Sequence, residues 1–365
     1  MDNLRRPFAP LRRLDWVALL CTYILLGIGV AFIYSAGYER ENTQWIRQIG
    51  FVLLGTPLYF GAALFDYRRL RDWAYPLYLM SLLLLAGLFF FGMSIHGARR
   101  WYNLGFLMFQ PAEVAKLAAI CLLAMWFGDT LRNLRRPANV MVPLALILIP
   151  FALIAAQPDV GTGFILLCIF GAIVFSAGVS WKLLGLIALL GVLSLPVAWT
   201  MLRPYHRDRI MVYLEPDRDP LGRGWNRRQS EIAIGSGGLH GKGFKQGTQN
   251  VLGFLPVTVA PTDFIYSVIA EEKGFIGSAL MLTLYSVLFV ALARTSLRSQ
   301  DVFGRLMTIG ILTMLFTHVT INVAMTIGLM PIIGLPLPLV SYGGSFVLSM
   351  MLALGLAQSV YIRRS

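Results

Sequence analysis

The chain has 365 residues, of which 57% are hydrophobic and 13% are charged, and its mean hydropathy is +0.69. A soluble domain of this length would need a larger polar surface, so the composition excludes an ordinary soluble enzyme and predicts an integral membrane protein. The net charge of +13 does not indicate nucleic-acid binding, because the basic residues lie in short connections between apolar runs. Three cysteines lie inside such runs without metal-site spacing and are expected in the core: Cys21, Cys121 and Cys168.

A membrane-spanning helix needs roughly 20 apolar residues, and about ten runs that reach or approach this length follow one another along the chain. The first has no cleavage site of small residues and is flanked by arginines, so we expect a retained span with a cytoplasmic N-terminus. The sequence therefore predicts an all-α integral membrane protein with one polytopic domain over residues 1–365. The runs begin close to Trp16, Ile46, Ala74, Val114, Val140, Val160, Leu183, Phe264, Leu306 and Ser345.

Basic residues in the connections predict which way the spans run. Alternation from a cytoplasmic N-terminus puts the most basic connections and the C-terminus inside, as the positive-inside rule requires. The inner connections hold Arg68, Arg69 and Arg71, then Arg132, Arg135 and Arg136, then Lys182, then Arg294, Arg298 and Arg305, and finally Arg363 and Arg364. The short outer connections hold only Arg40, Arg47, Arg99 and Arg100.

One long connection, residues 203–262 between the seventh and eighth spans, is predicted to lie outside. It contains a glycine-rich stretch, residues 235–243, with Lys242 near its end. A Walker loop would need Ser or Thr after the lysine and a preceding strand, and this stretch has neither, so nucleotide binding is not expected. Two interpretations stay open: a flexible loop that uses glycine for turns, and a loop that contacts substrate.

The first of three acidic positions at span edges is Glu113, in the motif Gln-Pro-Ala-Glu that begins at Gln110. Proline and a carboxylate are both favoured in a first helical turn, and Lys116 three residues later is placed to pair with the acid. A purely structural role is therefore a serious alternative for this position taken alone.

The other two acids are Asp159, in Gln-Pro-Asp before Gly161, and Asp263, in Pro-Thr-Asp-Phe. Each also has a structural alternative, as a turn residue or at a helix N-terminus. The predicted topology nevertheless puts all three acids on the outer face, with nothing comparable on the inner face. Three such groups on one side, where charges near spans are costly, predict an active site or binding site at the outer leaflet.

Other polar residues inside the apolar runs are expected to be structural. Glu271 and Glu272, followed by Lys273, lie about 12 Å further along a helix from Asp263 and are predicted to line a cavity or pair internally. His318 and Asn322, four residues apart, are interpreted as a buried hydrogen-bonded pair.

Six motifs now stand in order along the chain: Gln-Pro-x-Glu with Lys, Gln-Pro-Asp-x-Gly-Thr, Asp-Pro-Leu-Gly, Ile-Ala-Ile-Gly-Ser-Gly-Gly-Leu, Thr-Asp-Phe-Ile and Leu-Pro-Leu-Pro-Leu-Val-Ser-Tyr-Gly-Gly-Ser. Together they resemble the SEDS family of bacterial shape, elongation, division and sporulation proteins over almost the whole chain. Gly-Lys-Gly at 241–243 and Gly-Thr-Gln at 247–249 are more similar to its elongation branch. The chain departs from the family pattern at 257–261, just before Asp263.

The resemblance implies a ten-helix fold in the bacterial cytoplasmic membrane and peptidoglycan glycosyltransferase activity on lipid II, with an outward-facing site. It implies that Asp263 is the essential aspartate and that Glu113, Lys116 and Asp159 are important cavity positions. Lys242, Arg209 and Ser341, the last within the sixth motif, are further candidates for substrate binding or support. It also implies a class B penicillin-binding protein as partner, with other membrane proteins of the elongation machinery.

Such a reaction agrees with the chemistry of these residues. A carboxylate can take the proton of the attacking sugar hydroxyl, and we assign that role to Asp263. Charge that grows on the leaving diphosphate needs cations: Lys116, Arg99, Arg100, Arg209 and Lys242 are candidates, and the acids leave open a divalent ion, Mg²⁺ or Mn²⁺. No Ser-x-x-Lys occurs, so cross-linking must come from the partner. The competing interpretations are a lipid II flippase or a non-catalytic scaffold.

Overall fold

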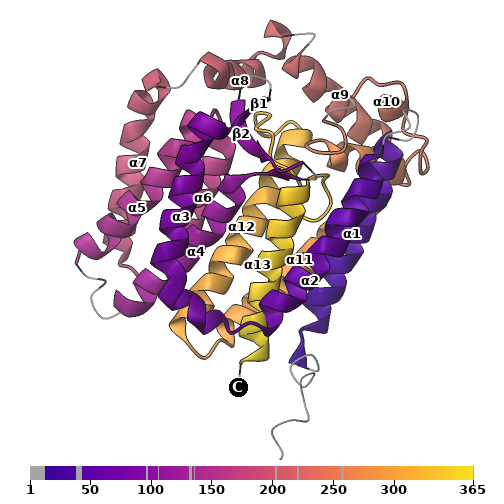
Figure 1. The fold of residues 1–365 in the computed structure, drawn as a ribbon. Coiled ribbons are helices and arrows are strands. Elements are labelled where there is room, and N and C mark those ends of the chain that lie inside the picture. Colours follow the sequence, from indigo (N-terminus) through magenta and orange to yellow (C-terminus); the bar gives the residue numbers. More distant parts are fainter. Residues whose placement is uncertain are drawn as a thin grey trace, which may run out of the picture.

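A computed structural model describes residues 13–37, 43–95, 98–105, 107–130, 134, 136–201, 204–219, 222–255 and 259–364. Within these ranges ten helices of 17 residues or more form a bundle (Figure 1). They are α1 (Trp16–Gly37), α2 (Gln44–Leu64), α3 (Leu70–Phe91), α4 (Pro111–Thr130), α5 (Ala138–Ala156), α6 (Val160–Ser176), α7 (Trp181–Met201), α11 (Ile265–Leu297), α12 (Val302–Thr326) and α13 (Gly344–Ile362). The chain is therefore an all-α, multi-pass membrane protein, as predicted.

The predicted span starts agree with these helices, since each long helix begins within four residues of the expected position. Seven described segments are long and apolar enough to cross a membrane by a strict criterion, and shorter apolar helices cover Val160–Ser176 and Trp181–Ser194. Some of the residues used above lie outside the described ranges. They are Pro220 and Leu221 of the third motif, residues 257–258 of the departure before Asp263, the arginines that flank the first span (Arg5, Arg6 and Arg12), and Arg40, Arg132 and Arg135 of the connections.

Helix α12 lies at the centre of the bundle, where it packs against α4, α6, α11 and α13. Helix α13 packs along α2, α3 along α4, and α1 along α11. Side chains from these helices form one large apolar core, whereas large apolar side chains on outer faces are exposed, as expected for surfaces in contact with lipid. The centre of α12 is thus the place where a buried polar group can reach the most helices.

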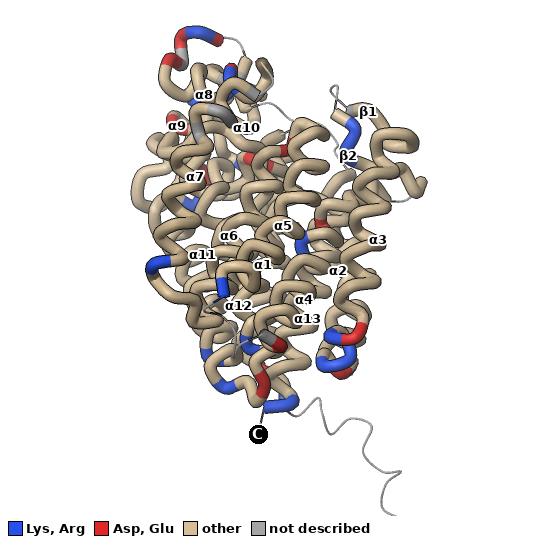
Figure 2. Tube along the Cα trace, turned by 90° about the vertical axis from the view of Figure 1, so that its left-hand side faces the viewer, with Lys and Arg blue, Asp and Glu red and all other residues tan. Residues whose placement is uncertain are grey.

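The two ends of the bundle differ. At the loop end, opposite the C-terminus, lie three short strands: β1 (Met93–Ile95), β2 (Ala98–Asn103) and β3 (Met108–Phe109), paired antiparallel in that order. The long connection adds α8 (Pro204–Leu214), the turn η5 (Pro216–Arg218), α9 (Arg223–Ser236) and α10 (Thr248–Val251) at the same end (Figure 1). Charged residues gather towards the two ends, as a membrane-embedded middle requires (Figure 2).

Helix α11 is broken at Gly274, whose φ of 64° is left-handed. Its 33 residues would extend about 50 Å as one helix, well beyond the roughly 30 Å of a hydrocarbon core. The part after the break, residues 275–297, covers about 35 Å and is long enough to span alone. The break therefore leaves a separate helical segment, residues 265–273, among the elements of the loop end.

The glycine-rich stretch fills this break. Carbonyl groups of Glu271 and Glu272 accept hydrogen bonds from the amides of Lys242 and Gly243, both at 3.0 Å. On the other side of the break, the amides of Phe275 and Ile276 donate to the carbonyls of residues 238 and 239, at 2.8 and 3.1 Å. Backbone groups freed by the break are thus paired again, which an apolar surrounding demands. The interpretation as a flexible loop is therefore wrong, because the stretch is hydrogen-bonded to both sides of the break in α11.

Candidate active site

Asp263 lies in the turn directly before α11, at the loop end of the bundle. Its amide donates to the carbonyl of Val259 at 2.9 Å, and its own carbonyl accepts from Nδ2 of Asn322 at 2.9 Å. Most of the surface of the residue is buried. A segment after α12 passes close to it, because a Cβ placed on Gly334 would lie 3.2 Å from Asp263 Oδ2. The backbone of Asp263 is thus held by hydrogen bonds on both sides, and its carboxylate lies close to the segment at Gly334.

The sixth motif contacts the same turn through Ser341. Its hydroxyl donates to the carbonyl of Thr262 and accepts from the amide of Leu337 at 2.8 Å. The amide of Tyr342 donates to Pro261 at 2.9 Å. Because Ser341 is fully buried and bonded to backbone groups, its place in the site is to fix the turn that carries Asp263.

Asp159 and Arg100 meet at the edge of this site. Asp159 is the N-cap of α6 and accepts from the amide of Thr162 at 3.3 Å, so the structural role expected for a turn aspartate is present. Arg100, on β2, has Nη1 3.8 Å from Asp159 Oδ2, and its Nε donates to the carbonyl of Gln157 at 3.0 Å. The guanidinium of Arg100 therefore links strand β2 to the Gln-Pro-Asp turn before α6.

Arg209 reaches the site from α8. Its Nη1 donates to the carbonyl of Ile333 at 2.7 Å, next to Gly334, and its guanidinium lies 4.7 Å from the ring centre of Tyr205. Nη2 also contacts the hydroxyl of that tyrosine at 2.6 Å. A residue from the long connection is thus attached to the segment that passes over Asp263.

The charged groups around Asp263 shift the pKa of its carboxyl in opposite directions. Surrounding protein raises the pKa of this carboxyl to about 6, chiefly by removing it from water. Arg209 and Arg100 lower the pKa of the same group through their positive charges, and Asp159 raises it. The structure therefore brings together two predicted acids and two predicted cations, with an aspartate that is readily protonated and deprotonated near neutral pH.

Glu113 and Lys116 form a separate, buried pair one level deeper. Lys116 Nζ lies 2.9 Å from Glu113 Oε1 and 2.9 Å from His318 Nε2, and Ser349 donates to Glu113 Oε2 at 2.8 Å. The pairing predicted from the sequence is confirmed. The interpretation of His318 and Asn322 as partners of each other is wrong, because His318 bonds Lys116 while Asn322 bonds backbone carbonyls.

Lys242 makes its side-chain contacts outside the site at Asp263. Its ammonium group lies 2.7 Å from Glu271 Oε1 and 2.6 Å from the hydroxyl of Thr248, beside the break in α11. Glu271 is fully buried, and Glu272 accepts a hydrogen bond from Ser35 on α1. The predicted internal pairing of these two acids is confirmed, and Lys242 belongs to that cluster, about 12 Å along α11 from Asp263.

The site holds two features that sequence reasoning missed or left unspecific. Arg100 was one of several candidate cations, and nothing in the sequence indicated its contact with the turn at 157–159. Asn322 was assigned to the wrong partner, although a lone amide on an otherwise apolar helix is a usable signal that something nearby needs a donor. In the described part of the chain, no group of three or more His, Cys, Asp or Glu side chains could hold a metal ion.

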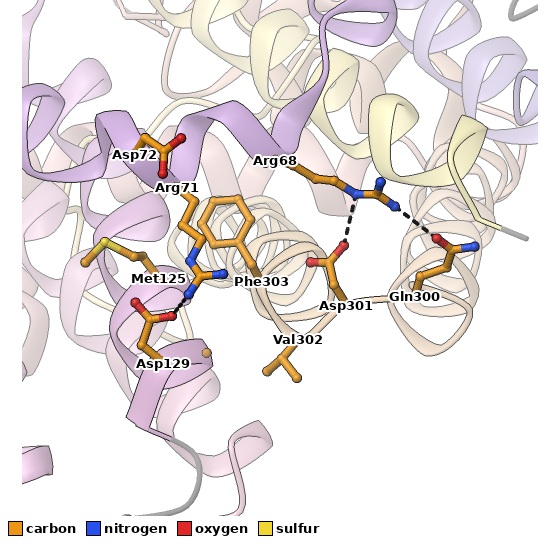
Figure 3. A pocket seen from close by; sticks show the side chains of 10 residues that line it. Arg68, Arg71, Asp72, Met125, Asp129, Gln300, Asp301, Val302 and Phe303 are labelled. Carbon is orange, nitrogen blue, oxygen red and sulfur yellow. Dashed lines mark hydrogen bonds and ion pairs between the residues drawn. The ribbon is translucent and has the colours of Figure 1, made fainter.

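A cavity lies at the other end of the bundle, and Figure 3 shows the side chains that line it. It measures about 710 Å³ and lies among the starts of α3 and α12 and the end of α4. Arg71 pairs there with Asp129, and Arg68 Nε lies 3.7 Å from Asp301 (Figure 3). Asp301 precedes Asn322 by 21 residues of chain, or about 30 Å along α12, so this cavity is distinct from the site at Asp263.

A comparison with protein families agrees with this arrangement. The family model of FtsW, RodA and SpoVE, described as "Cell cycle protein", matches residues 15–365. The chain belongs to this family. It is 39% identical over 355 residues to the peptidoglycan glycosyltransferase MrdB of Escherichia coli K12, covering 96% of this chain and 94% of the relative. It is 31% identical to the peptidoglycan glycosyltransferase RodA of Treponema pallidum, covering 96% and 98%.

Solved structures show the same fold. One, from work on the structural coordination of polymerization and crosslinking by a peptidoglycan synthase complex, has a TM-score of 0.79 and 33% identity, and covers 96% of this chain and 98% of that chain. The crystal structure of the rod shape determining protein RodA of Thermus thermophilus has a TM-score of 0.72 and 31% identity, covering 96% and 97%.

Proposed function

We propose that this protein is a peptidoglycan glycosyltransferase of the RodA type that joins lipid II molecules into β-1,4 glycan strands during cell elongation. The observation that carries this proposal is the carboxylate of Asp263, close to two arginines at the loop end of the bundle. The resemblance to MrdB and RodA over nearly the whole chain supports the same activity.

Asp263 is assigned as the general base. A sugar hydroxyl is a poor nucleophile, and a carboxylate in hydrogen-bond reach removes its proton as attack proceeds. A pKa near 6 leaves this group deprotonated at neutral pH and more basic than an ordinary aspartate. Attack by the 4-hydroxyl of the acceptor on the anomeric carbon breaks the bond to the diphosphate and inverts an α-linked donor, with no covalent intermediate.

Arg209 and Arg100 are assigned to the leaving group. Negative charge grows on the undecaprenyl diphosphate as it departs, and preorganised guanidinium groups stabilise that charge. Lys242 and Lys116 have a different place in this proposal, because each is paired with a buried glutamate. They support the site, together with Glu113 and Ser341, by holding helices and turns.

A divalent ion is compatible with this arrangement. Asp159 and Asp263 offer two carboxylates, and Mg²⁺ is commonly bound by one or two carboxylates together with substrate phosphates and water. Bound there, the ion would neutralise charge on the diphosphate. Acceptor activation would still belong to Asp263, and Asp159 would orient the ion or the acceptor.

The loop end is proposed to face outwards from the bacterial cytoplasmic membrane. Among the short connections, basic residues lie mostly at the opposite end, for example Arg68, Arg71, Arg298 and Arg363, as the positive-inside rule expects of a cytoplasmic side. Figure 2 shows several blue segments at that end, near the C-terminus. No ATP is present outside the cell, so the donor must arrive already activated, and lipid II meets that need. We propose a class B penicillin-binding protein as the partner that cross-links the product, alongside other membrane proteins of the elongation machinery.

The test is polymerisation of purified lipid II by this protein with its cognate penicillin-binding protein. We expect Asp263→Ala and Asp263→Asn to abolish glycan chains while thermal melting and the complex are retained. Asp217→Asn, which removes a carboxylate from the exposed turn η5, is the matched control and should polymerise normally. Normal chain formation by Asp263→Asn would contradict the assignment of the base, and transport of labelled lipid II across vesicles would then be measured for the flippase alternative.

A further inference from the structure

Asn322 occupies an unusual position on α12. It is fully buried, and its Nδ2 donates one hydrogen bond to the carbonyl of Asp263 at 2.9 Å and one to the carbonyl of Leu335 at 2.7 Å. Both donors of the amide are therefore used, while its Oδ1 has no partner among the described residues. Burying this oxygen without a partner costs free energy, which the two donated hydrogen bonds must offset. The position is therefore suited to a side chain with two donors.

These two bonds join the segments that define the space at Asp263. Leu335 follows Gly334, the residue that lies against the Asp263 carboxylate, and Arg209 bonds Ile333 one residue before that glycine. The three-residue segment 333–335 is thus attached to Arg209 at its first residue and to Asn322 at its last. The distance between the Asp263 carboxylate and the Arg209 guanidinium depends on where Asn322 holds this segment.

The rotation of α12 at this level is fixed by the buried ion pair. His318 lies one turn from Asn322 on the same helix and bonds Lys116, which is itself bonded to Glu113 on α4. Because Lys116 has no exposed surface, it reaches the site only through such neighbours. A continuous set of contacts therefore runs from α4 through α12 to the turn that carries Asp263.

We infer that Asn322 is a positioning residue for glycosyl transfer, which sets the separation of Asp263 from Arg209 by joining the turn before α11 to the segment 333–335. This inference rests on the proposed role of Asp263 as base. Asn322 is assigned no contact with the reacting atoms, and it acts through the two backbone carbonyls to which it donates.

The test compares Asn322→Leu, which keeps the branching at Cγ and removes both donors, with Asn250→Leu. Asn250 is a matched control because it is also buried and its Nδ2 donates to a backbone carbonyl, that of Ser35, at 3.1 Å. Neither residue is part of the site at Asp263. We expect Asn322→Leu to lower kcat for lipid II polymerisation by about 10- to 100-fold with KM changed less than about threefold, because misplacement of a reacting group affects the chemical step. Asn250→Leu should lower melting temperature alone.

The pH profile gives a second readout that a loss of stability would not move. Release of segment 333–335 weakens the influence of Arg209 on Asp263, so the midpoint of the rate against pH should rise in Asn322→Leu and stay unchanged in Asn250→Leu. If Asn322→Leu does not fold, Asn322→Ser, which keeps one short donor, is measured for the same changes at smaller size. Equal rates per folded molecule in the Asn322 and Asn250 variants would overturn the inference. Polymerisation by Asp263→Asn would instead overturn the proposed base, so the two failures are distinguishable.

Discussion

Lys116 Nζ lies 2.9 Å from Glu113 Oε1, and the two side chains have 0% and 4% of their surface exposed. They are three residues apart on α4, so their side chains share one face of the helix. A buried pair of this kind is costly to break from one side, because the remaining charge stays in an apolar surrounding.

The first prediction concerns this pair. Lys116→Met should destabilise the protein by about 3–5 kcal/mol, since Glu113 would be left buried and charged. Glu113→Gln combined with Lys116→Met removes both charges and should recover a large part of the loss. The measurement is thermal melting in detergent. Equal melting temperatures for wild type and the single variant would show that the pair contributes little to stability.

The second prediction separates Lys242 from Arg209. Arg209→Met should lower polymerisation by about 10²- to 10³-fold, a loss typical for one group that stabilises transition-state charge. Lys242→Met should lower stability by about 1–3 kcal/mol through Glu271 while the folded fraction keeps near-normal rates. Rates corrected for folded protein test both. A large rate loss in Lys242→Met with an unchanged melting temperature would show that Lys242 acts on the leaving diphosphate.

The third prediction is the pH dependence of the reaction. With the pKa of Asp263 raised to about 6, kcat/KM should rise with pH below 6 and level off above about 7. Stability should follow the opposite direction. A carboxyl whose pKa is higher in the folded state contributes stability at low pH and loses it as pH rises through the folded value. At pH 7 to 8, Asp263→Asn should therefore melt no lower than wild type, and a clear drop in its melting temperature would contradict the burial cost assigned to this carboxylate.

The fourth prediction concerns the break in α11. A Cβ at Gly274 would lie 2.4 Å from the amide nitrogen of Gly241, and its φ of 64° already disfavours other residues. Gly274→Ala should therefore destabilise by several kcal/mol, roughly 3 or more from strain and displaced contacts. Gly27→Ala in α1 is the control, because a Cβ there meets nothing within 4 Å and should be neutral or slightly stabilising. Equal effects of the two substitutions would show that the loop can move away from the break without loss.

The sequence predicted what short-range rules determine. Apolar runs gave the long helices, the spacing of Glu113 and Lys116 gave their pair, and Gln-Pro-Asp before Gly161 gave a turn aspartate, which the structure shows as the N-cap of α6. Each depends on residues within one or two turns of one another, where the geometry of the helix leaves little choice.

Contacts between segments that are distant in the sequence could not be predicted from it. Asn322 and Asp263 are 59 residues apart, and Lys116 and His318 are 202 apart. Which helix faces which is decided by side-chain packing between apolar surfaces of similar composition, and periodicity carries no information about the partner. The same limit hid the insertion of residues 237–243 into α11, because glycine in a loop predicts a turn but not the backbone that will meet it.

The order of segments along the chain also bears on how the protein enters the membrane. The glycine-rich stretch and Lys242 precede Glu271 and Glu272, so ribosomal synthesis delivers the partners of these acids before the acids themselves. In the proposed orientation, the long connection reaches the outer side ahead of α11, so the carboxylates of α11 meet their partners there and need not stay unpaired in lipid. A circular permutation that moved residues 204–255 behind α11 would remove this advantage and should reduce the yield of inserted protein rather than the stability of what is inserted.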